Sequence, residues 1–438
     1  AGIAAVISLI VPIQMVSQTW DDHDRSGRYT CRDFGKNYLT SVDENGIIFT
    51  NGDNDTFPLW YAQETEGYRT DVRVCNLSYL QTDWYVNQMK SQAYESDPLP
   101  ISMEESQYGN KKREYAYILD RVDYPVSVKM AMDYFLSDDE RTKTIPGYGK
   151  INHLPTGELF IDIDKEKILK SGIVPKGYED KIVDRIDLSF KDKNTLILND
   201  LAIIDLLSTN AETGWKRPVY FATTVDPSFF TETDKYFMRT GMAYEVVPVK
   251  LENTPGRYQV NTDKMYDNVM NKFVWGGIDV NPDIYLDETI RRMCYSYRIM
   301  FIDLIDQLIQ EGKTDKALKA LDYCMEKIPG DVVPHNYISL QLAMDYYFLK
   351  QNEKGKALLE KIADSAIEYV TWINSLDNNK KRSVQRDYYY NERALAEQVI
   401  PMFYRFGDEE SGKKYLEKAA LAGVDINRYF KIDTSKTN

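Results

Sequence analysis

The sequence has few of the residues that build disulfide scaffolds and zinc centres. Its 438 residues include four cysteines and three histidines, and no two cysteines form a CxxC motif. The histidines, His23, His153 and His335, lie far apart along the chain. A disulfide-stabilised small fold and a zinc site bound by histidine or thiolate are therefore not expected.

The chain also lacks an excess of basic residues. It carries 54 Lys and Arg against 68 Asp and Glu, which gives a net charge of −14. Nucleic-acid binding needs concentrated positive charge to displace counterions from phosphates, so no nucleic-acid partner is expected. Walker, GxGxxG, GxSxG and HExxH motifs are missing as well, which leaves NTPases, dinucleotide enzymes, serine hydrolases and zincins without support.

An uncharged apolar segment opens the sequence. Residues 1–20 contain no Asp, Glu, Lys or Arg and are rich in Ile, Val and Leu. A membrane-spanning helix needs about 20 such residues, and Trp20 stands where an interfacial aromatic anchor would. We interpret residues 1–20 as the end of a transmembrane helix that attaches the chain to the membrane. A buried N-terminal helix or strand is the alternative.

Charged residues follow this segment directly. They are candidates for binding a phosphate or a lipid headgroup beside the membrane, and a solvated junction is the alternative. The residues are Asp22, His23, Asp24, Arg25 and Arg28.

Residues 21–280 show the alternating pattern of an α/β domain. Buried strands are expected at 47–50, 72–77, 219–223 and 243–249, and amphipathic helices at 31–42 and 57–66. The first two strands and the helix between them fit the roughly 30 residues of a parallel βαβ unit.

Residues from about 98 to 195 are less regular and rich in Pro and Gly, so we interpret them as a large insertion in the α/β domain. Strands are expected within it at 126–132 and 158–163, and a helix follows it at 195–209.

Helical patterns dominate residues 281–438. Gly312 precedes Ala317 by five residues, and the same spacing from a turn residue to a small residue recurs at Asn352–Ala357 and Gly407–Gly412. These features are typical of tetratricopeptide-like helical hairpins of irregular length. Hairpins of this kind stack on one another and offer a surface to a protein partner. The predicted fold is thus an α/β domain with βαβ units and an insertion, followed by an all-α domain of tetratricopeptide-like hairpins.

A polar turn follows the first expected strand. Asp53-Asn54-Asp55 has the DxD form that can hold a divalent cation, since carboxylates two residues apart at a loop can reach one hard ion. The turn runs from Asn51 to Thr56 at the carboxyl end of a strand, where open α/β sheets bind ligands, and Asn76 ends the neighbouring strand. The alternative is that Asp55 or Thr56 only caps the next helix.

Four segments resemble a bacterial membrane-protein family catalogued as a domain of unknown function and classed with protein O-mannosyltransferase-like, polytopic glycosyltransferases. These segments are Trp20–Thr30, Phe49–Tyr61, Arg69–Val74 and Trp215–Ala222. The resemblance implies a soluble region that follows many membrane spans and lies on the periplasmic side of the inner membrane. Such enzymes use a lipid-linked sugar donor, and their catalytic carboxylate lies in a loop outside this region, so no catalytic residue is assigned here.

The sequence therefore predicts an extracytoplasmic region that binds a glycan or protein acceptor, or a partner, and is not itself catalytic. By analogy with an aromatic-Asp-Gly motif of oligosaccharyltransferases, Trp60 and Tyr61 join the turn as acceptor-binding candidates. A membrane-anchored scaffold for protein complexes is the competing function. A metal-dependent hydrolase using Asp53 and Asp55 is a further alternative.

Overall fold

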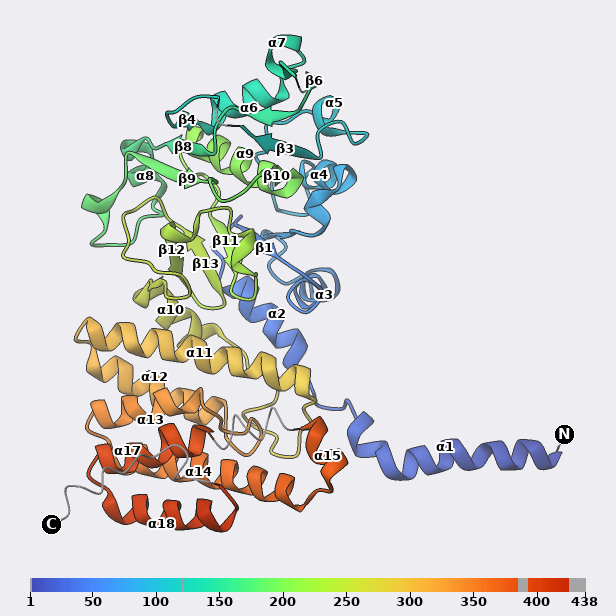
Figure 1. The fold of residues 1–438 in the computed structure, drawn as a ribbon, viewed down its shortest axis with the longest axis vertical. Helices are drawn as coiled ribbons and strands as arrows, with labels where there is room; N and C mark the ends of the chain where they lie inside the picture. Colours follow the sequence, from blue (N-terminus) through green and yellow to red (C-terminus); the bar gives the residue numbers. More distant parts are fainter. Residues whose placement is uncertain (1, 120, 148, 385–392, 425–438) are drawn as a thin grey trace. The chain divides into compact units, whose positions relative to one another are not determined.

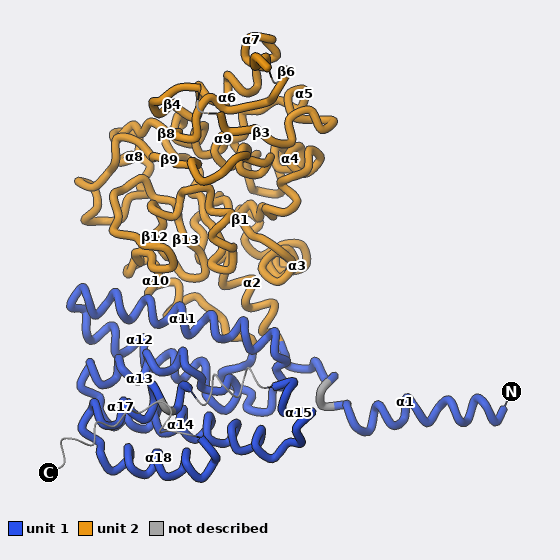
Figure 2. The backbone as a smooth tube through the Cα atoms, viewed as in Figure 1, with its two compact units in different colours: residues 1–28, 277–438 blue, residues 29–276 orange. Residues whose placement is uncertain are grey.

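A computed structural model describes residues 2–119, 121–147, 149–384 and 393–424 (Figure 1). The chain forms two compact units (Figure 2). One is Tyr29–Gly276, and the other is Gly277–Asn438 together with Ala1–Arg28.

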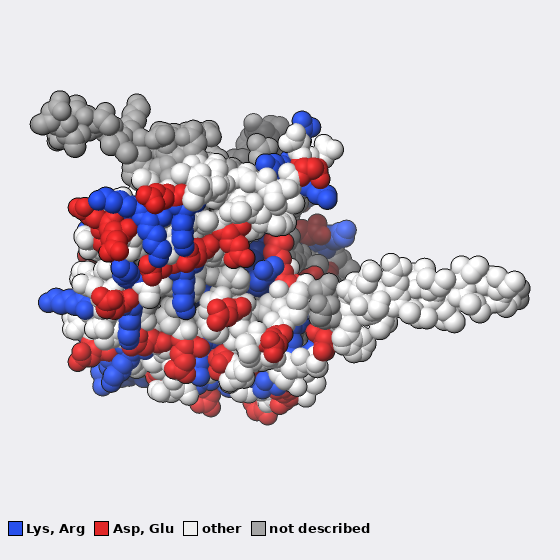
Figure 3. All heavy atoms as spheres, turned by 90° about the horizontal axis from the view of Figure 1, so that it is seen from below, with Lys and Arg blue, Asp and Glu red and all other residues white. Residues whose placement is uncertain are grey.

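The N-terminal apolar segment forms helix α1 (Gly2–His23), which contains Pro12. Its stretch Gly2–Trp20 is long and apolar enough to cross a membrane, and none of it is buried. Figure 3 shows this helix as an uncharged rod, in contrast to the mixed charges on the visible face of the helical unit. Length and composition qualify α1 as a membrane anchor or a signal sequence. The alternative of a buried N-terminal element is wrong, since Ile3, Val6 and Ile10 are each more than half exposed.

The unit Tyr29–Gly276 is built on a six-stranded sheet of order β14-β12-β13-β11-β1-β2. Its strands are β1 (Ile47–Thr50), β2 (Arg73–Asn76), β11 (Val219–Ala222), β12 (Phe237–Arg239), β13 (Ala243–Val246) and β14 (Gln259–Val260). β1 is parallel to β2 and β11, whereas β13 is antiparallel to β11 and β12. Every residue of β1, β2 and β11 is buried, which matches the largely apolar sequences of β1 and β11. In β2 the buried residues include the polar Arg73 and Asn76. The predicted βαβ unit is confirmed.

Helices α2 (Thr30–Thr40), α3 (Phe57–Glu66), α4 (Asp83–Met89) and α10 (Thr262–Asp267) accompany this sheet. α2 packs against α3 closely enough that a Cβ at Gly35 would lie 2.3 Å from the Pro58 carbonyl oxygen. Gly67, with φ of +62°, ends α3 in the left-handed conformation that glycine tolerates. The helix linking the two parallel strands is thereby fixed at both ends.

Residues 98–212, the insertion and the helix that follows it, carry two three-stranded sheets and one two-stranded sheet in the described residues. Their orders are β10-β3-β7, β4-β8-β9 and β5-β6. The strands are β3 (Tyr115–Ile118), β4 (Val126–Ser127), β5 (Thr144–Ile145), β6 (Gly149–Lys150), β7 (His153–Leu154), β8 (Glu158–Asp162), β9 (Arg185–Ser189) and β10 (Thr195–Ile197). The helices are α5 (Glu105–Tyr108), α6 (Val128–Leu136), α7 (Glu140–Lys143), α8 (Lys165–Ser171) and α9 (Leu198–Glu212).

Two predictions for this region are corrected. The strand expected at 126–132 ends at Ser127, whose side chain accepts a hydrogen bond from the Met130 amide and starts α6. The buried residues of α6 include Val128, Ala131, Met132 and Phe135, and this i, i+3, i+4, i+7 spacing is helical. The helix expected from Thr195 begins only at Leu198, because residues 195–197 pair with β3.

The second unit is helical, as predicted. Its helices are α11 (Glu288–Gln310), α12 (Thr314–Lys327), α13 (Ser339–Phe348), α14 (Asn352–Ser375), α15 (Asn378–Ser383), α17 (Ile400–Arg405) and α18 (Glu409–Leu421). α11 packs on α12, α13 on α14, and α17 on α18.

The predicted spacing of turn and small residues holds for two of these helix pairs and shifts in the third. Gly312 and Gly407 have positive φ, and Ala317 and Gly412 are buried five residues later. In the middle pair Ala357 is exposed. The residues with these roles are Lys350, with φ of +60°, and Gly355, where a Cβ would lie 2.7 Å from the Tyr347 ring.

Candidate functional site

The polar turn predicted as a ligand site lies at the carboxyl ends of parallel strands. β1 pairs with β2 and β11 in parallel, so these three strands end at the same edge of the sheet. Thr50, the last residue of β1, pairs with Asn76, the last residue of β2. The structure therefore brings the turn and Asn76 together, as the sequence predicts.

Asp55 is the buried carboxylate of this turn. It is 2% exposed, and its Oδ2 atom accepts hydrogen bonds from the Asn51 amide (3.1 Å) and the Thr224 hydroxyl (2.8 Å). Its Oδ1 atom is buried without a hydrogen-bond partner among the described residues. Burial raises the pKa of Asp55, and the hydrogen bonds from Asn51 and Thr224 act in the opposite direction. The carboxylate thus ties the turn to the residues that follow β11.

Thr56 holds the turn to the neighbouring strand. Its hydroxyl lies 2.8 Å from the Thr50 hydroxyl and accepts a hydrogen bond from the Asn76 amide at 2.9 Å. Thr56 occupies the N-cap position of α3 but makes no side-chain hydrogen bond to that helix. The capping role expected for Asp55 or Thr56 is therefore wrong, because both side chains bond across the sheet edge.

The remaining turn residues differ in their surroundings. Asn51 accepts a hydrogen bond from the Ser78 hydroxyl at 2.8 Å, whereas Asp53 and Asn54 are exposed. No group of three or more His, Cys, Asp or Glu side chains that could hold a metal ion is found in the described residues. Of the DxD carboxylates, Asp53 faces solvent and Asp55 is engaged with Thr224.

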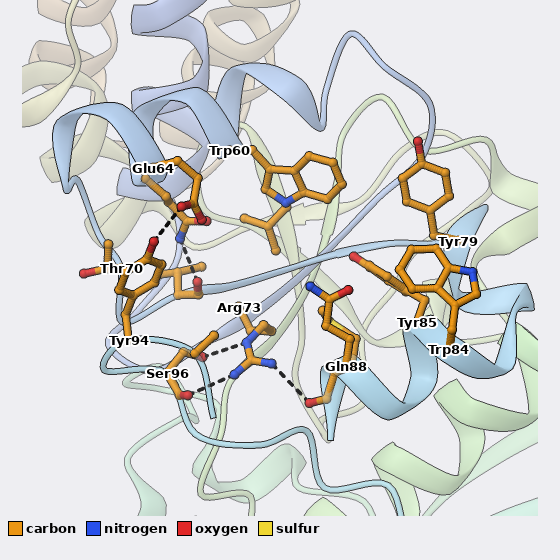
Figure 4. A pocket seen from close by; sticks show the side chains of 15 residues that line it. Trp60, Glu64, Thr70, Arg73, Tyr79, Trp84, Tyr85, Gln88, Tyr94 and Ser96 are labelled. Atoms are coloured by element: carbon orange, nitrogen blue, oxygen red, sulfur yellow. Dashed lines mark hydrogen bonds between the residues drawn. The ribbon is translucent and has the colours of Figure 1, made fainter. Parts of the chain in front are cut away.

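An aromatic cavity lies beside this turn, between α3 and α4 (Figure 4). Its volume is about 580 Å³, and β2, the edge strand of the large sheet, lines it through Arg73 and Val74. The lining residues are Trp60, Gln63, Glu64, Thr70, Val72, Arg73, Val74, Tyr79, Trp84, Tyr85, Gln88, Met89, Ala93, Tyr94 and Ser96. Trp60, predicted as an acceptor-binding residue, lines this cavity. Tyr61 is 47% exposed and does not line it.

A row of aromatic rings runs from the turn into the cavity. The Phe57 and Trp60 rings stack with centroids 5.7 Å apart, and the Trp60 and Tyr79 rings lie 6.2 Å apart with planes inclined by 15°. Tyr79 also contacts Trp84 and Tyr85, with centroids 6.2 and 5.7 Å away. Trp84 is 55% exposed, so the row ends at the molecular surface.

Arg73 forms the inner wall of the cavity. Its guanidinium donates hydrogen bonds to the carbonyl oxygens of Met89, Ser91, Ser96 and Asp97. The side chain is 4% exposed, and burial lowers the pKa of its guanidinium. Among the described residues, its hydrogen-bond partners are neutral oxygen atoms, and these bonds hold the 89–97 loop against β2.

The predicted membrane-proximal residues have separate local partners. His23 Nδ1 lies 2.8 Å from the Thr19 carbonyl oxygen, and Asp24 accepts a hydrogen bond from the Ser26 amide at 2.8 Å. Hydrogen bonds from the side chain and the backbone N–H of Ser26 lower the pKa of the Asp24 carboxyl group. The side chain of Asp22 lies outside the described residues.

The two predicted arginines of this segment also differ. Arg28 forms an ion pair with Asp287 at 3.3 Å, and Asp287 caps α11 through the Ile290 amide. Arg25 is exposed. His23, Asp24 and Arg28 thus each contact a different residue.

Sequence reasoning missed most of the cavity. Tyr79, Trp84, Gln88 and Tyr94 come from a short 3₁₀ turn, a seven-residue helix and a loop. The signal that was available is the concentration of aromatic residues between positions 79 and 94, directly after a predicted strand.

One comparison with known proteins gives a match. The family model described as TMEM260-associated domain 2 matches residues 31–264, which contain the large sheet, the turn and the cavity. No curated protein and no solved structure matches the chain.

Proposed function

The chain belongs to the family described as TMEM260-associated domain 2, and we propose that it is the acceptor-binding, extracytoplasmic region of a membrane glycosyltransferase-like protein. In this proposal it binds a glycan or protein acceptor and leaves the transfer of sugar to another part of the protein. The observation that carries the proposal is the aromatic cavity beside the polar turn. Concave sites of 300–1,000 Å³ that combine aromatic walls with a few polar groups are the usual form of ligand pockets.

The position of the cavity supports this function. It is formed by residues between 60 and 96, so the matched family region contains all of it. The side chains of Thr50, Thr56 and Asn76 hydrogen-bond to one another at the start of α3. These bonds and the ring contact with Tyr79 hold Trp60 at the cavity wall. Fixed aromatic walls bind a ligand with little loss of side-chain entropy.

The N-terminal helix supports a location at the membrane. Its exposed Ile, Leu and Val side chains would be covered by lipid if α1 is the last part of a membrane span. The proposal places the protein in the inner membrane, with the two compact units in the periplasm.

The helical unit favours a second candidate function, a scaffold for protein assembly. Several large apolar side chains of this unit are strongly exposed, among them Tyr337 (67%), Phe348 (66%) and Leu421 (90%). Stacked hairpins of tetratricopeptide style present such residues to protein partners.

The test uses the intact membrane protein in cells and measures glycan transfer. Trp60→Ala and Trp84→Ala each remove a ring of the cavity, and Trp372→Ala removes an exposed tryptophan of the helical unit as a matched control. Transfer should fall in the two cavity variants and remain at the wild-type level in the control, at equal protein levels. Wild-type transfer in both cavity variants would contradict the acceptor-binding proposal. Loss confined to Trp372→Ala would favour the scaffold.

A further inference from the structure

Two aromatic rings of the cavity lie with nearly parallel planes. The Trp60 and Tyr79 planes are inclined by only 15°, with centroids 6.2 Å apart, and both rings border the cavity in Figure 4. A hexopyranose carries its C–H groups on the faces of the sugar ring, where they are slightly positive. The faces of aromatic rings are slightly negative, so a sugar face and an aromatic face attract each other.

Polar side chains line the same cavity as these rings. Figure 4 shows the Gln88 amide pointing into the cavity, where no hydrogen bond to it is formed within the described residues. Glu64 receives a hydrogen bond from the Tyr94 hydroxyl at 2.5 Å through one carboxylate oxygen. An amide both donates and accepts, and a carboxylate accepts, which suits the paired hydroxyls of a sugar.

Side chains occupy outward-facing backbone groups at both ends of the edge strand β2, so a peptide strand cannot pair along it. The side-chain amide of Gln63 donates a hydrogen bond to the Val72 carbonyl oxygen at 2.8 Å, and the Tyr85 hydroxyl accepts one from the backbone N–H of Asn76 at 3.0 Å. Only Val74 remains between these two capped positions. Strand addition needs a row of free backbone groups, so the edge favours a compact ligand over an extended peptide.

We infer that this cavity binds a hexopyranose unit, with one sugar face on the Trp60 ring and its hydroxyl groups at Gln88 and Glu64. This inference rests on the proposed function and names the chemical class of the part of the acceptor that enters the cavity. Tyr94, which is 60% exposed and bonded to Glu64, borders the ligand on the outer side.

The test measures binding of methyl hexopyranosides of gluco, galacto and manno configuration to the purified 438-residue chain in detergent. Saturation-transfer NMR detects weak binding, and titration gives the dissociation constants. At least one of these sugars should bind in the millimolar range. Trp60→Ala should weaken binding about tenfold, the effect of losing one aromatic contact. Gln88→Ala should weaken it about fivefold, as expected for one hydrogen bond.

Two further variants keep the test independent of misfolding. Trp60→Phe retains an aromatic face and should bind more tightly than Trp60→Ala. Trp372→Ala lies outside the cavity and should bind as the wild type does. Absence of binding by all three sugars, or equal weakening by Trp60→Ala and Trp372→Ala, would overturn the inference.

The outcome is separable from that of the proposed function. If the cavity variants abolish glycan transfer in cells while the purified chain binds none of the sugars, the hexopyranose is wrong and the acceptor site stands. If the sugars bind and transfer in cells is unchanged, the acceptor function is wrong and the sugar site stands.

Discussion

The guanidinium of Arg73 donates hydrogen bonds to both oxygen atoms of Ser96, at 2.9 Å to the carbonyl oxygen and 3.3 Å to the hydroxyl. Arg73 belongs to the edge strand and Ser96 to the loop that borders the cavity. This contact makes the shape of the cavity depend on one buried side chain.

Arg73→Met should therefore lower the free energy of unfolding by about 3 kcal/mol, since several buried carbonyl oxygens lose their donor. Urea denaturation of the purified chain measures this change. The control is Arg257→Met, at an exposed arginine of the same unit, which should stay within about 0.5 kcal/mol of the wild type. Equal stability of the two variants would show that Arg73 does not hold the loop.

Thr56→Val tests the contact between the turn and β2. The substitution keeps the shape of the side chain but removes the hydroxyl shared with Thr50 and Asn76, and it should cost about 1–2 kcal/mol. Asp53→Ala, at an exposed position of the same turn, should be nearly silent. If Thr56 only capped α3, Thr56→Asn would keep the wild-type free energy of unfolding, because Asn is a good N-cap residue. That result would contradict the contact with Thr50 and Asn76.

Asp345 makes the stability of the helical unit depend on pH. Burial, aided by the charge of Asp306, raises its pKa from 3.8 to about 7. Between about pH 4 and 7 the Asp345 carboxyl group is ionised in the unfolded chain and protonated in the folded protein. The contribution of Asp345 to the free energy of unfolding is therefore greatest at low pH. It declines by up to about 4 kcal/mol as the pH rises through that window.

Asp345→Asn is the matched variant for this prediction. It removes the titration and retains an acceptor for the Gln341 amide, which bonds to Asp345 at 2.8 Å. The difference in urea midpoint between variant and wild type should grow in favour of the variant from pH 4 to pH 7. A constant difference across this range would show that Asp345 does not titrate there.

Deleting residues 2–18 should raise the solubility of the chain and leave its thermal midpoint unchanged, because none of this helix is buried. Differential scanning calorimetry of the purified proteins measures the midpoint. A large decrease would mean that the segment contributes to a hydrophobic core.

The sequence predicted the central βαβ unit because local signals agree there. A largely apolar strand, a turn and a helix ended by Gly67 point to the same structure, which the pairing of Thr50 with Asn76 completes. The strand expected at 126–132 failed because Val128 and Met132 suit either period, and the Ser127 side chain decides for the helix.

The candidate site was predicted only in part. Asn51, Thr56 and Asn76 lie where the strand order predicts them, and Trp60, which was predicted by analogy, lines the cavity beside them. The hydrogen bonds of Thr56 and Asp55 reach residues 4–169 positions away, so a local pattern cannot separate a helix cap from a contact across the sheet. The cavity depends likewise on how a short helix and a loop pack on an edge strand.

Photo-crosslinking of the protein in cells tests the acceptor-binding proposal most directly. A photoreactive phenylalanine analogue replaces Trp84 at the cavity mouth or, in the control, Trp372 of the helical unit. After irradiation of cells, mass spectrometry identifies what is attached. We expect glycan-bearing adducts at position 84 that decrease severalfold when Gln88→Ala is added, and none at position 372. Adducts at position 372 alone, or at both positions without dependence on Gln88, would contradict the proposal.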